Sequence, residues 1–351
     1  MQVFVVGGFV RDKLLGLKSV DKDFVVVGSS IQKMQDLGYQ QVGKDFPVFL
    51  HPKTKQEYAL ARIERKISKG YKGFEFDTKS VSLKEDLSRR DLTINAIAMS
   101  VDGEIIDYFG GQKDLQLGIL RHISSSFCED PVRVLRVARF AAKFKNFGFK
   151  VAHSTHKLMQ QMVESGEVDN LVSERVFAEL NKALSYNTPS AFFKTLANCG
   201  GFKSIFGVEK DINLHKNNFE FLDNLNTENE IKFALWLLNY QDFEIKNICK
   251  KLSVPKKYKE LAVFGNGFKG FATNFENKTP SQKLEFFNKT DSTRRVERFD
   301  KILKVWQLVG IDTKNITQTN TKIKNIDIKK MNMENIIIEL KNAKLKICSS
   351  L

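Results

Sequence analysis

Through about residue 110, the chain alternates short runs of β-branched and aromatic residues with helix-like or glycine-rich segments. The strand-like runs are QVFVV, DFVVV, PVFLHP, EYALAR and EIIDYFG. Strands that alternate with helices are typical of an α/β fold. This part of the chain is therefore predicted to form an α/β unit.

From about Leu117 onward, apolar residues recur at helical spacing and the strand signals fade, as in PVRVLRVARFAAKFKNFGF and SERVFAELNKALS. The remainder is predicted to be all-helical. Breaks are expected near Gly200-Gly201 and in HKNNFEFLDNLNTENE. The stretch rich in Asn, Thr and Lys after Gly310 is expected to form a poorly packed tail.

Length and composition indicate a protein of several domains that is not embedded in a membrane. The chain has 351 residues, more than the roughly 250 to 300 that one hydrophobic core usually holds. No apolar run reaches the roughly 18 residues of a transmembrane helix, and no secretory signal precedes QVFVV, so a cytoplasmic location is expected. The scattered cysteines, without CxxC spacing, argue against a disulfide framework or a zinc ribbon.

The chain is basic. Lys and Arg outnumber Asp and Glu by 56 to 41, a net charge of +15. Such a surplus favours a polyanionic partner, with nucleic acid as the first candidate. The alternative is a coding bias toward Lys, Asn and Ile, which the C-terminal stretch makes plausible.

The opening segment GGFVRD follows a strand-like run and precedes the helix-like KLLG. A helix N-terminus offers free N–H groups to an anion, and Gly7 and Gly8 would let a phosphate approach the backbone closely. The alternative is a tight structural turn. In DKD, Asp21 and Asp23 would share one face of a strand, where two carboxylates repel unless a cation lies between them. Mg²⁺ is the cation usually held this way with phosphates, and a solvated turn is the alternative.

Four motifs together carry a family resemblance: GGFVRD, DKD, RRDLTINA at 89–96 and EDPVRVLRVARF at 129–140. In this order and spacing they resemble the class II tRNA nucleotidyltransferases, the bacterial CCA-adding enzymes, from Met1 to about residue 205. The resemblance implies a polymerase-β-like nucleotidyltransferase head over 1–115 and an all-α neck over 116–205. It also implies a helical body and tail over 206–351 that bind tRNA. The implied reaction adds C, C and A to tRNA 3′ ends from CTP and ATP without a nucleic-acid template, and releases pyrophosphate.

The resemblance also implies roles for single residues. Asp21 and Asp23 would be catalytic and hold Mg²⁺, and Gly8 and Arg11 would contact the triphosphate. The residues that would bind the incoming ATP or CTP are Arg90, Arg136 and Arg139. Guanidinium groups match phosphate oxygens bidentately, which agrees with this assignment, although a solvated basic stripe on a helix is the alternative.

Two further motifs are interpreted in the same way. In EDPVR, Glu129, Asp130 and Arg133 occupy the positions of an amino-acid template that reads C and A, or Asp130 caps a helix with a local salt bridge. In RRDLTINA, Asp91 and Asn95 order the Arg90 loop or touch the ribose, or Asp91 caps a helix LTINAIAM.

Two segments of the head are less specific. RIERKISKGYKGFEF, residues 62–76, resembles the family's flexible head loop, with an ordinary mobile loop as the alternative. Glu57 is a candidate third metal ligand, although a solvated strand residue is favoured.

The sequence also separates several related functions. No His-Asp dipeptide occurs, so the phosphohydrolase site of longer relatives is not expected. Within the enzyme class, the alternatives are a poly(A) polymerase and a partial CC- or A-adding enzyme. The stretch KDFPVFL at 44–50 favours the CCA-adding form over the former, and the intact loop disfavours a CC-adding enzyme. An alternative from a different class is a non-catalytic tRNA-binding protein. Such a protein would have little reason to keep Asp21, Asp23 and the arginines together. No protein partner is inferred.

Overall fold

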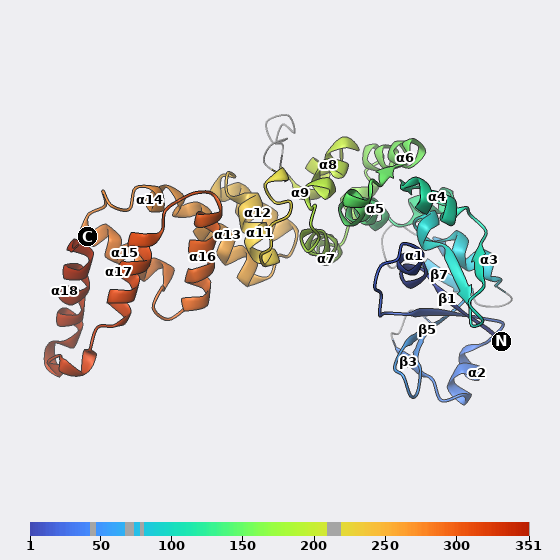
Figure 1. Ribbon diagram of the computed structural model, residues 1–351, viewed down its shortest axis with the longest axis horizontal. Helices are drawn as coiled ribbons and strands as arrows, with labels where there is room; N and C mark the ends of the chain where they lie inside the picture. The colour runs from blue at the N-terminus through green and yellow to red at the C-terminus, as the bar shows by residue number, and fades with distance from the viewer. Residues whose placement is uncertain (43–46, 67–73, 78–80, 209–218, 351) are drawn as a thin grey trace. The chain divides into compact units, whose positions relative to one another are not determined.

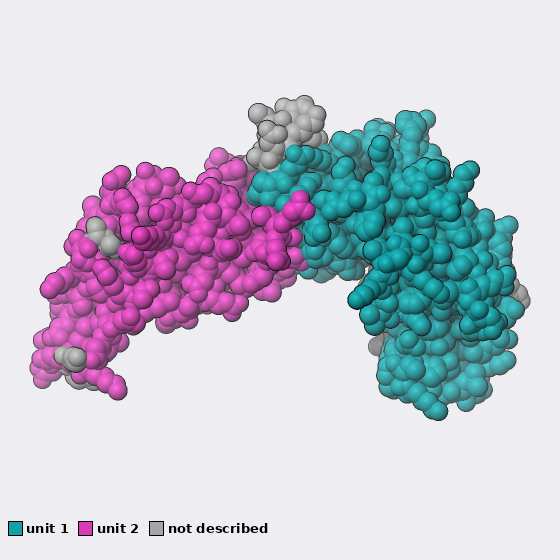
Figure 2. Space-filling view, viewed as in Figure 1, with its two compact units in different colours: residues 1–223 teal, residues 224–351 magenta. Residues whose placement is uncertain are grey.

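The computed structural model describes residues 1–42, 47–66, 74–77, 81–208 and 219–350. The chain forms two compact units, residues 1–223 and 224–351 (Figure 2). The predicted domain boundaries near residues 115 and 205 both fall within the first unit and remain predictions. None of the helices in the described ranges is long and apolar enough to cross a lipid bilayer.

The first unit contains a seven-stranded sheet with the order β3-β4-β5-β2-β1-β8-β9 (Figure 1). Its neighbouring strands are antiparallel except β2 and β5, which are parallel. The strand-like runs of the sequence are therefore found as strands, and the predicted α/β head is confirmed. The strands are β1 (Gln2–Val6), β2 (Asp23–Val27), β3 (Gln40–Val42), β4 (Val48–Leu50), β5 (Glu57–Leu60), β8 (Ile97–Ser100) and β9 (Ile105–Asp107).

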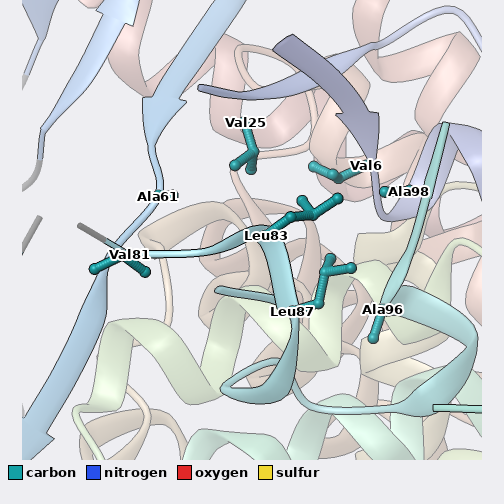
Figure 3. Close-up of a cluster of buried hydrophobic side chains, with 8 residues drawn as sticks. All are labelled: Val6, Val25, Ala61, Val81, Leu83, Leu87, Ala96 and Ala98. Atoms are coloured by element: carbon teal, nitrogen blue, oxygen red, sulfur yellow. The ribbon is translucent and has the colours of Figure 1, made fainter. Parts of the chain in front are cut away.

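Both faces of the central strand β2 are buried. On one face, Val25 packs with Leu83 and Leu87 of α3 (Leu83–Ser88) in the cluster that Figure 3 shows. On the other, Val26 packs with Met34 of α2 (Ile31–Asp36). Burying such side chains stabilises the fold by about 1.5–3 kcal/mol each. Asp23, the first residue of β2, is therefore attached to a rigid strand.

The segment LTINAIAM is not a helix. It forms a 3₁₀ turn, η1 (Thr93–Asn95), followed by β8, which pairs with β1 and β9. Ile97 and Ala98 are fully buried in the sheet. A short apolar run buried on both faces lacks the alternation that separates strand from helix, so the pattern was ambiguous here.

After the head sheet, the described part of the first unit is mainly helical, as predicted. Helix α5 packs against α7 and α8. Two two-residue strands, β10 (Ile119–Leu120) and β11 (Lys150–Val151), pair in parallel within this region. The helices of the first unit not yet named are α1 (Gly8–Leu14), α4 (Gly111–Leu117), α5 (Val132–Phe144), α6 (His153–Glu164), α7 (Ser173–Leu184), α8 (Ser190–Asn198) and α9 (Gly201–Phe206).

The second unit is helical throughout its described residues. Its C-terminal part is packed, because Ile316, Ile323 and Cys348 are buried, so the prediction of a poorly packed tail was wrong. The many Asn and Thr residues of this segment make the helical spacing of its buried positions hard to recognise in the sequence. The helices are α11 (Asn229–Leu237), α12 (Asp242–Lys251), α13 (Lys256–Gly267), α14 (Lys269–Thr273), α15 (Pro280–Thr290), α16 (Val296–Leu308), α17 (Lys314–Lys324) and α18 (Ile336–Ser349).

Two predicted features lie partly outside the described residues. Strands β6 (Ile63–Lys66) and β7 (Phe74–Asp77) form an antiparallel pair, whereas residues 67–73 of the predicted flexible loop are outside them. Residues 44–46 of the KDFPVFL stretch are outside them as well, and Pro47 to Leu50 lead into and form β4.

Candidate active site

A pocket of about 490 Å³ in the first unit collects most of the residues singled out from the sequence. It lies where α1, the start of β2, the segment Arg89–Asn95 and α5 meet. Asp21 and Glu129 do not line it. The predicted residues that do are Gly8, Arg11, Asp23, Arg90, Asp130, Arg133, Arg136 and Arg139.

The lining is strongly cationic. Among the described residues that line it, the carboxylates are Asp23, Asp91 and Asp130, and they face a larger set of basic groups. A cleft lined by one sign of charge concentrates ligands of the opposite sign, and guanidinium groups favour phosphate oxygens. The basic residues are Arg11, Arg62, Arg89, Arg90, Arg133, Arg136, Arg139, Lys143 and Arg175.

Gly7 is required by the backbone at the start of α1. Its φ of 71° is in the left-handed region, and a Cβ here would lie 3.1 Å from Nη1 of Arg90. At Gly8, a Cβ would lie an ordinary 3.5 Å from Nη2 of Arg11. Gly7 is therefore needed both for its backbone conformation and for the close approach of Arg90, whereas Gly8 is not required by sterics within the described residues.

Arg11 is buried and held from two sides. Its Nε donates to Oδ1 of Asp12 at 2.8 Å, and its Nη1 donates to Oδ1 of Asn95 at 2.6 Å. Its guanidinium lies 5.2 Å from the ring centroid of Phe140 and 5.1 Å from that of Phe144. Burial lowers the pKa of Arg11, and the charge of Asp12 offsets part of this effect. The side chain is thus fixed before any ligand binds.

Asp91 and Asn95 connect Arg11 to α5. Asp91 accepts from the Leu92 N–H, from Nδ2 of Asn95 at 2.9 Å and from Nε of Arg136 at 2.7 Å. Although burial raises the pKa of Asp91, the charge of Arg136 and these hydrogen bonds bring it well below its ordinary value. Of the interpretations left open by the sequence, the observed contacts match an ordering role rather than a helix cap.

Arg90 is positioned by a buried carboxylate. Its Nη2 donates to Oδ2 of Asp86 at 3.3 Å, and the Asp86 side chain is fully buried. The Nε of Arg90 is buried without a hydrogen-bond partner among the described residues. An unpaired buried donor in a cationic pocket fits an anionic ligand that is absent from the structure.

Asp23 begins β2, whereas Asp21 lies two residues before the strand rather than on it as predicted. Partial burial and the charge of Asp21 raise the pKa of Asp23, and the charge of Arg90 opposes the shift. The two carboxylates are thus close enough to interact. Their oxygen donors suit Mg²⁺, which takes the rest of its ligands from phosphates and water.

Glu57 is the first residue of β5. Phe24 and Tyr58 are partners in the parallel β2–β5 pair, so the residues before them, Asp23 and Glu57, begin neighbouring strands. Within the described ranges, however, no group of three or more His, Cys, Asp or Glu side chains is arranged to hold a metal ion. Glu57 itself is exposed, as expected for a solvated strand residue, and its part in a metal site stays a hypothesis.

Arg136 and Arg139 extend from α5 into the pocket. The charge of Asp91 raises the pKa of Arg136. The Nε of Arg139 donates to Glu179 of α7, its Nη1 donates to the Tyr186 hydroxyl at 3.1 Å, and its guanidinium lies 4.2 Å from the centroid of the Phe140 ring. The stripe of arginines is therefore anchored, not freely solvated.

Asp130 and Arg133 lie at the start of α5. Oδ1 of Asp130 accepts from the Val132 N–H at 3.0 Å, so it caps the helix, and Oδ2 pairs with Arg175 at 3.0 Å. Arg133 donates from Nη1 to the carbonyl of Ser126 at 2.7 Å and from Nη2 to that of Arg89. Both side chains line the pocket and are held by these contacts. The ion-pair partner of Asp130 lies on α7, so this pair is not the local salt bridge considered from the sequence.

Several residues of the pocket and its support were missed by sequence reasoning. Arg175 and Glu179 stand on the half-buried face of α7, beside Val176 and Leu180. Charged residues on an apolar helical face are a signal that could have found them, because buried charges need partners. The other missed residues are Asp12, Arg62, Arg89, Phe140 and Lys143.

Comparison with known proteins agrees with this site. Residues 3–121 match the family described as the poly A polymerase head domain, and residues 148–210 match a probable RNA and SrmB-binding site of polymerase A. The CCA-adding enzyme of Coxiella burnetii is 43% identical over 337 residues, which cover 94% of this chain and 88% of the relative.

Solved structures are similar along the whole chain. An apo form of a CCA-adding enzyme superimposes with a TM-score of 0.70 at 26% identity, over 99% of this chain and 88% of that one. A CCA-adding enzyme in complex with ATP gives a TM-score of 0.68 at 25% identity, over 99% and 86%. The head shared with poly(A) polymerases and the extensive identity to curated relatives show that this chain belongs to the CCA-adding enzymes, a family of nucleotidyltransferases.

Proposed function

We propose that this protein adds C, C and A in turn to the 3′ end of tRNA, using CTP and ATP without a nucleic-acid template and releasing pyrophosphate. The observation that carries the proposal is the pocket itself, in which Asp23 at the end of a rigid strand faces the arginines of α5. Carboxylates for a metal and guanidinium groups for phosphates are what nucleotidyl transfer requires. A protein with this role in tRNA processing would act in the cytoplasm.

Asp21 and Asp23 would hold Mg²⁺. When bound, the ion would promote loss of the proton from the attacking 3′ hydroxyl and stabilise the charge on the leaving pyrophosphate. The protein's own groups fix the nucleotide for this attack. Gly8 and Arg11 would contact the triphosphate, and Arg90, Arg136 and Arg139 would bind the incoming ATP or CTP. Each of these four arginines is held by a carboxylate described above.

Asp130 and Arg133 would select the base, with Glu129 beside them in the same motif. Cytosine and adenine both present an amino donor next to a ring-nitrogen acceptor, whereas uracil and guanine present the reverse. A carboxylate acceptor beside a guanidinium donor therefore pairs with the correct two bases and leaves polar groups unpaired with the other two. The helical body and tail of residues 206–351 would bind the tRNA, which their basic composition supports.

Incubation with Mg²⁺, labelled nucleotides and three tRNAs tests this proposal. The tRNAs end before CCA, after the first C and after CC. Ordered addition of C, C and A is expected. An enzyme that stops after CC, or accepts only the tRNA ending in CC, would be a partial CC- or A-adding enzyme, and long tails of A would indicate a poly(A) polymerase.

A further inference from the structure

We propose that Lys143 of α5 is a ligand for the phosphate groups of the incoming nucleotide, and that Asp12 of α1 is the positioning residue that holds Lys143 and Arg11 side by side. The proposal rests on the function proposed above, since it takes the pocket to bind CTP and ATP. Asp12 is the last residue of the GGFVRD motif, and Lys143 lies outside the motifs that were interpreted from the sequence.

Asp12 joins two elements of the first unit behind the pocket. Its side chain is 11% exposed and does not line the pocket, whereas both of its cationic partners do. Oδ1 accepts from Arg11 at 2.8 Å, and Oδ2 pairs with Nζ of Lys143 at 3.0 Å. One carboxylate thus fixes a cation from α1 next to a cation from α5.

The positive charge at this point exceeds what Asp12 can neutralise. Burial and the charges of Arg11 and Arg139 lower the pKa of Lys143, and Asp12 only partly opposes this effect. Arg11 and Lys143 share one carboxylate, which leaves one net positive charge facing the pocket. Phosphate groups would supply the missing negative charge.

Lys143 also has the hydrogen-bonding capacity for a ligand. Its ammonium carries three N–H groups, and the two oxygens of Asp12, at 3.0 and 3.3 Å, account for at most two of them. The side chain is 24% exposed and lies over the Phe144 ring, 5.0 Å from its centroid. Packing therefore restrains the amine at the pocket wall with a donor to spare.

Binding of inorganic tripolyphosphate, measured by calorimetry without tRNA, tests the proposal directly. Lys143→Met keeps the apolar stem and removes the charge. Because it deletes one charge-assisted hydrogen bond, it is expected to raise the Kd for tripolyphosphate and the KM for both CTP and ATP by roughly tenfold. Lys143→Arg keeps the charge and is expected to retain most of the affinity. Lys157→Met on α6 removes an exposed lysine outside the pocket and serves as the matched control.

The variant Asp12→Asn tests whether Asp12 positions Arg11 and Lys143 for the ligand or whether Lys143 only balances the charge of Asp12. It is expected to weaken tripolyphosphate binding severalfold, because Arg11 and Lys143 would repel each other without their shared carboxylate. The double variant Asp12→Asn/Lys143→Met is expected to bind no better than Lys143→Met. If Lys143 only balanced the buried Asp12, the double variant would instead recover wild-type affinity. Thermal unfolding identifies misfolded variants, and Lys143→Gln then replaces Lys143→Met.

Wild-type affinity for tripolyphosphate in Lys143→Met, or its recovery in the double variant, would overturn the assignment of Lys143. Undiminished affinity in Asp12→Asn would overturn the positioning role. These outcomes are independent of the proposed function, because ordered addition of C, C and A by the wild-type protein is measured separately. If the wild-type protein bound tripolyphosphate through Lys143 but did not add C, C and A to tRNA, the proposed function would be contradicted and the role of Lys143 would stand.

Discussion

The carboxylate of Asp130 is ion-paired with Arg175, Oδ2 to Nη2 at 3.0 Å, while its Oδ1 accepts the Val132 N–H at 3.0 Å. The residue that would read the base is therefore both a helix cap and one half of an ion pair. Nη1 of Arg175 also donates to Oδ1 of Asp130, at 3.4 Å. A carboxylate has about four lone-pair sites, so these three contacts leave room for one more donor, such as the amino group of a base.

Loss of Asp130 or Arg133 is expected to relax base selection. Asp130→Ala or Arg133→Ala should slow the use of CTP and ATP and also reduce discrimination against UTP and GTP, because the wrong bases would leave fewer buried groups unpaired. The measurement is kcat/KM for each nucleotide on a tRNA lacking its CCA end. Arg11→Ala is the control and should weaken all four nucleotides alike. If the Asp130→Ala enzyme were slower but as selective as wild type, Asp130 would not read the base, and helix capping would remain as its role.

Arg175 is expected to act through Asp130. Arg175→Met removes the ion pair but leaves the hydrogen bond from the Val132 N–H, so the carboxylate of Asp130 is held on one side only. Selectivity for CTP and ATP should fall in the same direction as in Asp130→Ala and by a smaller factor, and Arg175→Met in the Asp130→Ala background should add little further loss of selectivity. Independent, additive losses would show that Arg175 contributes by another route.

The two aspartates of the DKD motif are expected to be essential for addition. Asp21→Ala or Asp23→Ala should abolish nucleotide incorporation, while the fold and tRNA affinity stay largely intact, because the proposed role of these carboxylates is to hold metal and not to pack a core. Incorporation assays, circular dichroism and tRNA binding measure the three properties. Near wild-type incorporation in either variant would remove the metal assignment.

The head could be predicted from the sequence because its strands show alternation or β-branched runs between turns, as at β1 and β2. β8 was missed because Ile97 and Ala98 are buried on both faces and give no alternation. The packing of α17 was missed because polar residues dominate its composition, and its buried face combines Ile316 and Ile323 with the polar Thr319 and Asn320.

The site was predictable as far as its residues fall within short motifs. Gly8, Arg11 and Arg136 were found this way, and the structure brings them to one pocket. Arg175 and Lys143 could not be placed, because their roles depend on how α5 packs against α7 and α1. Helical periodicity shows that a face is buried, but it does not show which element covers it.

A second enzymatic activity is not expected. The chain contains no His-Asp dipeptide and only one histidine after His156, so a His-Asp metal cluster is not expected. Purified protein should therefore release no phosphate from phosphomonoesters and should not open 2′,3′-cyclic phosphates with any divalent metal. The assay compares wild type with Asp23→Ala, which controls for the nucleotidyltransferase site. Hydrolysis that persists through successive purification steps would reveal a site outside the motifs considered.

Asp91 is expected to make folding stability depend on pH in the acid range. Its pKa in the folded protein is well below the ordinary 3.8, because Arg136 and Asn95 stabilise the ionised form despite its burial. A depressed pKa contributes stability that is fully present above the unfolded-state value and is lost as pH falls below it. Asp91→Asn should thus lower the free energy of unfolding by on the order of 2 kcal/mol at neutral pH, since it breaks a buried pair.

The difference between wild type and Asp91→Asn should shrink as the pH falls below about 4, where the unfolded chain takes up the proton first. Urea unfolding at a series of pH values between about 3 and 7 measures it. Asp36→Asn, at an exposed position on α2, is the matched control and should differ from wild type by less than about 0.5 kcal/mol throughout. A difference for Asp91→Asn that stays constant across this range would mean that the ion pair with Arg136 does not stabilise the fold through its charge.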